Sequence, residues 1–104
     1  MFNSSLNNPY LIESYINGDN WYRIYSDGWC EQGGKVITTD QNVTVNLLKP
    51  YSNSDYSLMR TNISDSSTAT SVRMESVYEL TSTNFKISSF SAIDEIIWEA
   101  KGVL

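Results

Sequence analysis

The Asp27-Gly28 dipeptide, set between two short aromatic-rich runs, constrains the fold of this chain more than any other feature. Asp-Gly is a strong signal for a two-residue β-hairpin, because a type I′ turn needs positive φ at both central residues. Such a turn predicts three pairs on one sheet face: Tyr25 with Cys30, Arg23 with Gln32, and Trp21 with Gly34. The other face would carry Tyr22, Ile24, Ser26 and Trp29. Large apolar groups would then lie on both faces, so we expect each face to be covered.

Composition indicates one small domain and argues against several kinds of partner. A chain of 104 residues buries roughly 65% of its unfolded surface when it folds as a single domain. Twelve acidic and seven basic residues give a net charge of −5, and no Lys/Arg cluster is present, so we expect no nucleic-acid partner. No segment approaches the roughly 20 apolar residues of a membrane span, so we expect no membrane insertion. Cys30 is the single cysteine; an intrachain disulfide is therefore impossible, and we expect a buried thiol.

Short runs of alternating polarity, separated by turn residues, predict an all-β fold, a small antiparallel β-sandwich. Val43, Val45 and Leu47 point one way along their strand, and Phe85 and Ile87 do so along another. The expected strands are Tyr10–Ile16, Trp21–Ser26, Trp29–Thr38, Val43–Leu48, Tyr56–Thr61, Thr70–Leu80, Asn84–Phe90 and Glu95–Gly102.

The sequence contains few candidate catalytic residues. Histidine is absent, which excludes Ser-His-Asp and Cys-His nucleophilic machinery and histidine-based metal sites. Paired carboxylates of the glycosidase kind are formally available, but each is more simply a solvated surface acid. We expect no enzyme activity, no cofactor and no bound metal. The carboxylates concerned are Asp94 with Glu95, Asp55, Asp65, and Glu75 with Glu79.

Several segments of the chain match one known family. They are Ile12-Glu13-Ser14, the run from Trp21 to Trp29, Glu31-Gln32-Gly33-Gly34, Leu48-Lys49-Pro50-Tyr51 with Asp55-Tyr56, and Trp98-Glu99-Ala100-Lys101-Gly102. Together they resemble the C-terminal receptor-binding domains of bacteriophage or prophage tail fibres, whose β-sandwich tips are similar to the H-type lectins. The resemblance implies an H-type-lectin-like sandwich, a homotrimer, and a place at the extracellular tip of a fibre on the virion. It carries over no catalytic residue.

The resemblance also bears on the two ends of the chain. Residues 1–9 are polar, and we expect them to be the end of a fibre shaft or an artificial start, with residues 10–104 forming the receptor-binding sandwich. In the segment 93–100, four apolar residues follow the i, i+3, i+4, i+7 spacing of a helix, and Ser91 could cap it. A strand would instead place Ile96, Trp98 and Ala100 on one face. The pattern alone slightly favours a helix, but the all-β context and the resemblance lead us to predict a strand.

The aromatic residues suit two roles. Three Trp and seven Tyr would serve a sugar-binding surface, but aromatic side chains more often fill cores and subunit interfaces. We assign Trp98 and Tyr78 to the core. The covered faces of the hairpin should carry Trp21, Tyr25 and Trp29, and one of these two faces should pack against a neighbouring subunit.

Three functions fit these observations: a receptor-binding fibre tip that attaches non-covalently to a bacterial surface glycan or protein, a standalone H-type-like lectin, or a structural trimerisation or capping module without a receptor. If the strands alternate in direction, one group of loops gathers at the end opposite the chain entry, and we predict receptor binding there. The resemblance implies ligand binding at subunit interfaces instead. The predicted receptor-binding residues are Asn17, Asp19, Asn20, Asn42, Asn62 and Asp65.

Overall fold

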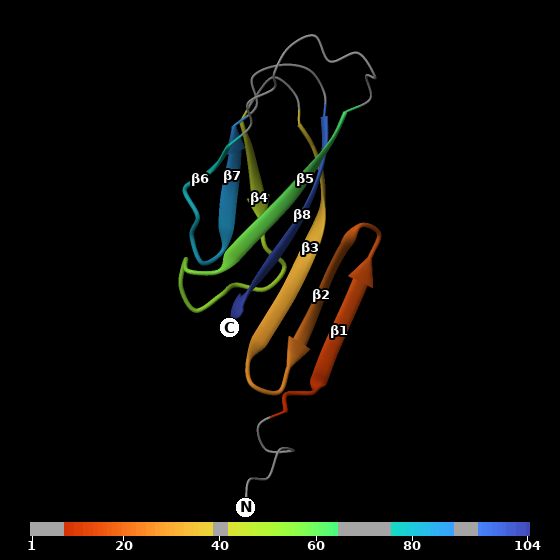
Figure 1. Ribbon diagram of the computed structural model, residues 1–104, viewed down its shortest axis with the longest axis vertical. Helices are drawn as coiled ribbons and strands as arrows, with labels where there is room; N and C mark the ends of the chain where they lie inside the picture. Colours follow the sequence, from red (N-terminus) through yellow and green to blue (C-terminus); the bar gives the residue numbers. More distant parts are fainter. Residues whose placement is uncertain (1–7, 39–41, 65–75, 89–93) are drawn as a thin grey trace, which may run out of the picture.

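The structure, a computed structural model, describes residues 8–38, 42–64, 76–88 and 94–104. Within these ranges it contains eight β-strands in two antiparallel sheets (Figure 1). The larger sheet has the strand order β1-β2-β3-β8-β5, and the smaller one β4-β7-β6. The strands are β1 (Leu11–Asn17), β2 (Asn20–Tyr25), β3 (Trp29–Thr38), β4 (Val43–Asn46), β5 (Ser57–Ser64), β6 (Ser76–Tyr78), β7 (Asn84–Ser88) and β8 (Asp94–Val103). The described part of the chain has no helix long and apolar enough to cross a membrane.

The predicted all-β antiparallel fold is confirmed, and each expected strand has an observed counterpart. Strand β3 has the predicted bounds, while β5 continues three residues beyond the expected Thr61, to Ser64. Of the expected strand Thr70–Leu80, residues 70–75 lie outside the described residues, as does Asp65. Residues 76–78 form β6, which ends before Glu79 and Leu80.

Strand β8 settles the choice between helix and strand for residues 93–100. It is an interior strand of the larger sheet and pairs with β3 along one edge and with β5 along the other. Its side chains alternate, because Ile96, Trp98 and Ala100 are buried while Ile97 is exposed. Two complete hydrogen-bond ladders outweigh the local helical spacing of the apolar residues.

The β2–β3 hairpin is built on a different turn from the one expected. Gly28 has φ +88° and donates its N–H to the Tyr25 carbonyl at 2.9 Å, while Asp27 does not have a positive φ. The loop is therefore three residues long, with the glycine in the left-handed region, rather than a two-residue type I′ turn. The register shifts by one, so that Ile24 pairs with Cys30.

The shift also corrects the predicted sheet faces. The expected pairs Tyr25–Cys30, Arg23–Gln32 and Trp21–Gly34 are replaced by Ile24–Cys30, Arg23–Glu31, Tyr22–Gln32 and Trp21–Gly33. A one-residue slip moves every side chain of one strand to the face of the other set. The inner face of the hairpin therefore carries the buried side chains Ile24, Cys30 and Gln32, with Tyr22 packed against the core beside them. The outer face carries Trp21, Tyr25 and Trp29.

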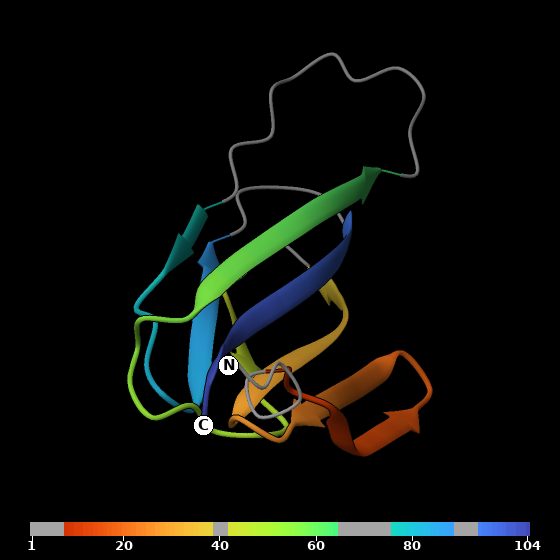
Figure 2. The ribbon, with the colours of Figure 1, turned by 60° about the horizontal axis from the view of Figure 1, so that its bottom comes forward.

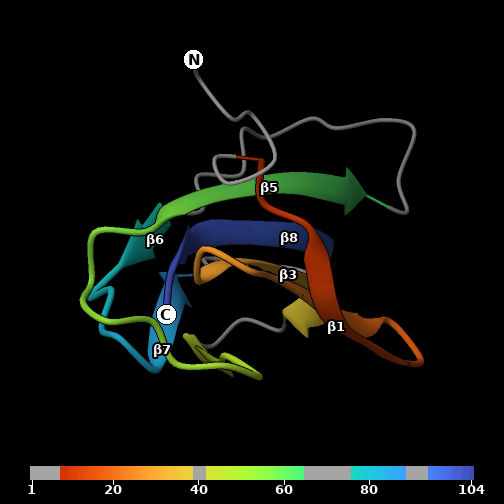
Figure 3. The same cartoon turned by 90° about the horizontal axis from the view of Figure 1, so that it is seen from below.

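The hydrophobic core lies between the two sheets (Figure 3), where the smaller sheet sits to one side of β5, β8 and β3. Phe85 and Ile87 of β7 are fully buried, and the Phe85 ring meets Trp98 edge-on with centroids 5.2 Å apart. Trp98 is a core residue, as expected. Tyr78 is not: its neighbour Val77, paired with Ile87, packs against the core instead.

Strand β1 leaves the sandwich with β2 as a projecting hairpin (Figure 2). All seven of its residues are exposed. They include Leu11, Ile12, Tyr15 and Ile16, with Ile16 78% exposed. Its side chains are tied to the body through Glu13, which accepts a hydrogen bond from the Tyr22 hydroxyl and lies 3.7 Å from Lys49 Nζ. An edge strand with apolar groups open on both faces is an unusual surface for a finished assembly.

Candidate functional site

The predicted receptor-binding residues do not all lie together. Asn62 lies near the end of β5, beside the start of β8 and the end of β3, and Asn42 just precedes β4; Figure 1 shows these ends gathered at the top of the sandwich. Asn17, Asp19 and Asn20 lie at the turn of the β1–β2 hairpin, lower on the side of the molecule. The group predicted from strand direction is therefore divided between two places, and its role stays a prediction.

The three aromatic side chains assigned to a subunit interface share the outer face of the larger sheet. Trp21 and Tyr25 alternate with the inward Ile24, and Trp21 lies across Gly33. The Arg23 guanidinium stacks over the Trp21 ring at 4.6 Å and pairs with Glu31 at 3.8 Å. The same face carries further exposed apolar side chains on β3, β5 and β8: Ile37, Met59, Ile63 and Ile97.

A cleft of about 290 Å³ opens where β8 ends. We call it the Trp29 cleft; it is lined by Trp29 from the start of β3, by most of the connection 51–57 and by residues 101–103. Gly102 makes its floor possible, because a Cβ there would lie 2.8 Å from Tyr56 and 3.1 Å from Tyr51. The two tyrosine rings stack on each other with centroids 4.7 Å apart.

Hydrogen bonds fix the wall formed by the connection 51–57. The Tyr51 hydroxyl donates to the Cys30 carbonyl at 3.0 Å, and the Tyr56 hydroxyl donates to the Asn84 carbonyl at 3.1 Å. Ser52 donates to the Val103 carbonyl through both its backbone N–H and its hydroxyl, at 3.0 and 3.1 Å. This wall of the cleft is therefore anchored to both sheets.

A buried glutamine holds the segment that leads into this wall. The Gln32 side chain is fully buried. Its amide nitrogen donates to the Lys49 carbonyl at 2.8 Å, and its oxygen accepts from the backbone N–H groups of Leu48 and Lys49 at 2.9 and 3.1 Å. One side chain thus satisfies three backbone groups of the β4–β5 connection.

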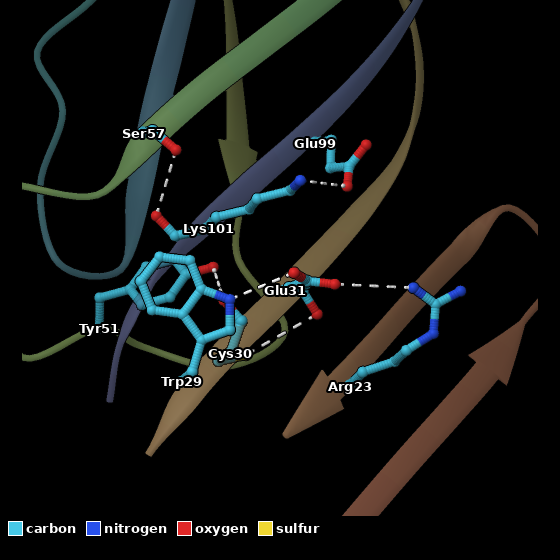
Figure 4. Close-up of polar contacts among 8 residues, drawn as sticks. All are labelled: Arg23, Trp29, Cys30, Glu31, Tyr51, Ser57, Glu99 and Lys101. Carbon is cyan, nitrogen blue, oxygen red and sulfur yellow. Dashed lines mark hydrogen bonds and ion pairs between the residues drawn. The ribbon is translucent and has the colours of Figure 1, made fainter. Parts of the chain in front are cut away.

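Trp29 lines the cleft, and hydrogen bonds fix its orientation, one of them to Glu31 (Figure 4). Its indole N–H donates to Glu31 at 3.2 Å, and its backbone N–H donates to the Asp27 carboxylate at 3.0 Å. The residue as a whole is 36% exposed. Lys101 lies at the end of β8 with its Nζ 3.6 Å from Glu99. The site therefore presents an anchored aromatic ring beside a cation.

Two polar side chains of the cleft keep hydrogen-bonding capacity for a ligand. The Asn53 oxygen accepts the Asp55 backbone N–H at 2.8 Å, which folds the loop tightly, and the Asn53 amide NH₂ has no hydrogen-bond partner in the part of the chain that the structure describes. Within the described residues, the Asp55 carboxylate takes no hydrogen bond or ion pair. Both side chains are exposed.

Burial disfavours the ionised form of a thiol and two tyrosine hydroxyls near the cleft. It raises the pKa of the Cys30 thiol above its ordinary value, and it raises the pKa of the Tyr51 and Tyr56 hydroxyls in the same way. The thiol is free and fully buried, as expected from the sequence. Lys101 and Asp55 are therefore the two charged groups that line the Trp29 cleft.

The sequence assigned Trp29 to an interface and gave Asn53, Asp55 and Lys101 no part in binding. A local signal existed, since Ser52-Asn53-Ser54-Asp55 is a polar run bracketed by two tyrosines. This local signal does not reveal the long-range pairing of the strands. The connection 51–57 meets the start of β3 and the end of β8 only because the two strands are neighbours in the sheet, where Trp29 pairs with Val103.

Comparisons with known proteins match the fold and nothing closer. No family model matches the chain, and no curated protein matches it. A structure of the P. aeruginosa R2 pyocin fibre, comprising its C-terminal residues 323–691, superposes with a TM-score of 0.71 at 17% identity, over 95% of this chain and 28% of that one. An N-truncated R2-type pyocin tail fibre gives a TM-score of 0.65 at 17% identity, over 95% and 40%. The chain spans less than half of either fibre piece, and it has the fold of a domain within them.

Proposed function

We propose that this chain is the receptor-binding tip of a phage or prophage tail fibre, and that it attaches non-covalently to a glycan or protein on the bacterial surface. The observation that carries the proposal is the superposition of 95% of the chain on pieces of a pyocin tail fibre. A domain at the end of such a fibre lies outside the cell on the virion and meets the bacterial envelope first. The anchored, aromatic and polar surface around Trp29 supports a role in recognition.

The attachment involves no bond-breaking chemistry in this proposal. The absence of histidine from the sequence removes the usual general base. Binding energy must then come from many weak contacts, and a fibre obtains it by presenting several copies of one site.

The functional unit is a homotrimer in this proposal, and the projecting β1–β2 hairpin contacts the neighbouring subunit. A threefold ring requires a heterologous interface, in which one patch of each subunit meets a different patch of the next. The exposed apolar side chains of β1, such as Leu11 and Ile16, supply one patch. Met59 and Ile97, exposed on the outer face of β5 and β8, supply the other. Trp21 and Tyr25 lie between the two patches in the sheet.

Oligomeric state tests the assembly directly. Ile16→Lys places a charge on a side chain that is 78% exposed in the single subunit, where a substitution ordinarily changes stability by less than about 0.5 kcal/mol. We expect native mass spectrometry to find a trimer for the parent chain and a folded monomer for the variant. Thr44→Lys, exposed on the smaller sheet, is the matched control and should remain trimeric. A parent chain that is monomeric at micromolar concentration contradicts the proposed assembly.

Cell binding tests the function. Fluorescently labelled trimer is mixed with a panel of bacterial strains, and bound fluorescence is measured after washing. We expect saturable binding that differs between strains, because surface receptors vary among them. A trimer that binds none of the strains would instead be a structural capping module.

A further inference from the structure

We propose that the Trp29 cleft is a subsite for one uncharged pyranose unit of a bacterial surface glycan. The inference rests on the proposed function and narrows it from any surface receptor to a carbohydrate, with a stated place on the domain. It also places the contact at the end of β8, away from the loop residues predicted from strand direction.

The size of the cleft limits the ligand. Its volume of about 290 Å³ lies just below the range of roughly 300–1,000 Å³ found for small-molecule sites. A single monosaccharide ring fits such a space, and the rest of a chain would continue into solvent. A short glycan end or one repeat unit is the expected occupant.

Trp29 provides the apolar platform that a pyranose ring needs. One face of many pyranoses presents axial C–H groups, which pack against the electron-rich face of an aromatic ring. The indole N–H of Trp29 is held by Glu31 at 3.2 Å, so the ring is oriented before a ligand arrives. Little side-chain entropy is then lost on binding.

Asp55 and Asn53 provide the hydroxyl contacts. The Asp55 carboxylate is a double acceptor that has no side-chain partner among the described residues, and the free NH₂ of Asn53 is a donor beside it. Two neighbouring sugar hydroxyls can each donate to the carboxylate while one accepts from the amide. The Lys101 ammonium adds a further donor to the lining of the cleft.

The charges of the cleft favour an uncharged sugar. Lys101 already forms an ion pair with Glu99 at 3.6 Å, and Asp55 adds a negative charge to the lining of the cleft. The chain as a whole carries a net charge of −5, which repels acidic sugars and phosphates. No cationic pair of the kind that usually binds a carboxylate or phosphate lines this cleft among the described residues.

Titration with simple sugars tests the subsite. The ¹⁵N-labelled protein gives one indole N–H signal for each of its three tryptophans, and these are assigned with Trp-to-Phe variants. The probes are the methyl glycosides of glucose, galactose, mannose and N-acetylglucosamine, with glucuronic acid as the acidic counterpart. We expect a saturable millimolar shift of the Trp29 indole signal with at least one neutral glycoside, no matching shift of Trp21 or Trp98, and weaker binding of the acid. No saturable Trp29 shift with any neutral probe overturns the proposal.

Two matched acid-to-alanine variants locate the contact. Asp55→Ala should weaken binding of the responsive glycoside about tenfold or more, because hydrogen bonds to a charged group are lost. Glu79→Ala, which removes an exposed acid between β6 and β7 outside the cleft, should leave the affinity unchanged. Equal affinity in both variants overturns the assignment of Asp55.

Whole-cell binding separates this inference from the function on which it rests. If Asp55→Ala trimers lose adsorption to a strain that the parent trimer binds, both stand. If they adsorb as well as the parent, the Trp29 cleft is not the receptor site, while receptor binding by the domain is retained. If the parent trimer binds no strain, the proposed function fails, and the sugar titration alone decides whether the cleft binds pyranoses.

Discussion

Replacing Gln32 by methionine removes the hydrogen bonds that hold the β4–β5 connection, with little change in the volume of the side chain. Three backbone groups lose their partner: the N–H groups of Leu48 and Lys49 and the Lys49 carbonyl. Leaving a buried polar group unsatisfied costs about 1–3 kcal/mol. Leu48 is 39% exposed, so water replaces part of the loss, and we expect a net destabilisation of about 2–4 kcal/mol.

Thermal and urea unfolding at one fixed protein concentration measure this loss. For a domain of about 100 residues, such a loss lowers the melting temperature by roughly 10–25 °C. Fixed concentration is needed because assembly contributes to the apparent stability. Lys35→Met on the exposed face of the same strand is the matched control and should change the free energy of unfolding by less than about 0.5 kcal/mol. A Gln32→Met variant as stable as this control would refute the stabilising role of the Gln32 hydrogen bonds.

Two further predictions concern the hairpins. Gly28→Val forces a β-branched residue to φ near +88° and should lower the free energy of unfolding in urea by about 1–3 kcal/mol. Asp27→Asn keeps the hydrogen bond from the Trp29 backbone N–H and should leave the free energy of unfolding nearly unchanged. Equal urea midpoints for the two variants would refute this turn. The hydrogen bond to Glu13 raises the pKa of Tyr22 from 10.0 to about 12, so it stabilises the fold below pH 10, and this contribution is lost as the pH rises from 10 to 12. Glu13→Gln should return the pKa toward 10, followed by an NMR titration of the Tyr22 ring; an unchanged pKa would contradict it.

The sequence predicts strands well where alternation and turn residues agree. Strand β3 is predicted to the residue, since it begins directly after a glycine turn. The turn itself is predicted one residue out of register. Asp-Gly fits both a two-residue loop and a three-residue loop that ends in a left-handed glycine. The choice depends on which side chains the core accepts, and Ile24 and Cys30 can both be buried only in the second register.

The candidate site is harder to predict because its parts are far apart in the chain. Trp29, Asp55 and Lys101 line one cleft only because β3 pairs with β8 and the connection 51–57 folds back over the end of that pair. The role of Gln32 is equally hidden, since glutamine is ordinarily exposed and nothing local marks this one as buried. Sequence periodicity predicts which face of a strand is apolar. It does not predict which loop a buried polar side chain such as Gln32 will bind.

The adsorption of trimer and monomer to the same bacteria tests multivalent receptor binding. We expect the parent trimer to bind at least one strain saturably, and the folded Ile16→Lys monomer to bind the same cells about 100-fold more weakly or worse, because avidity from three linked sites is lost. A monomer that binds as tightly as the trimer, or a trimer that binds no bacterium, would contradict a multivalent receptor-binding tip.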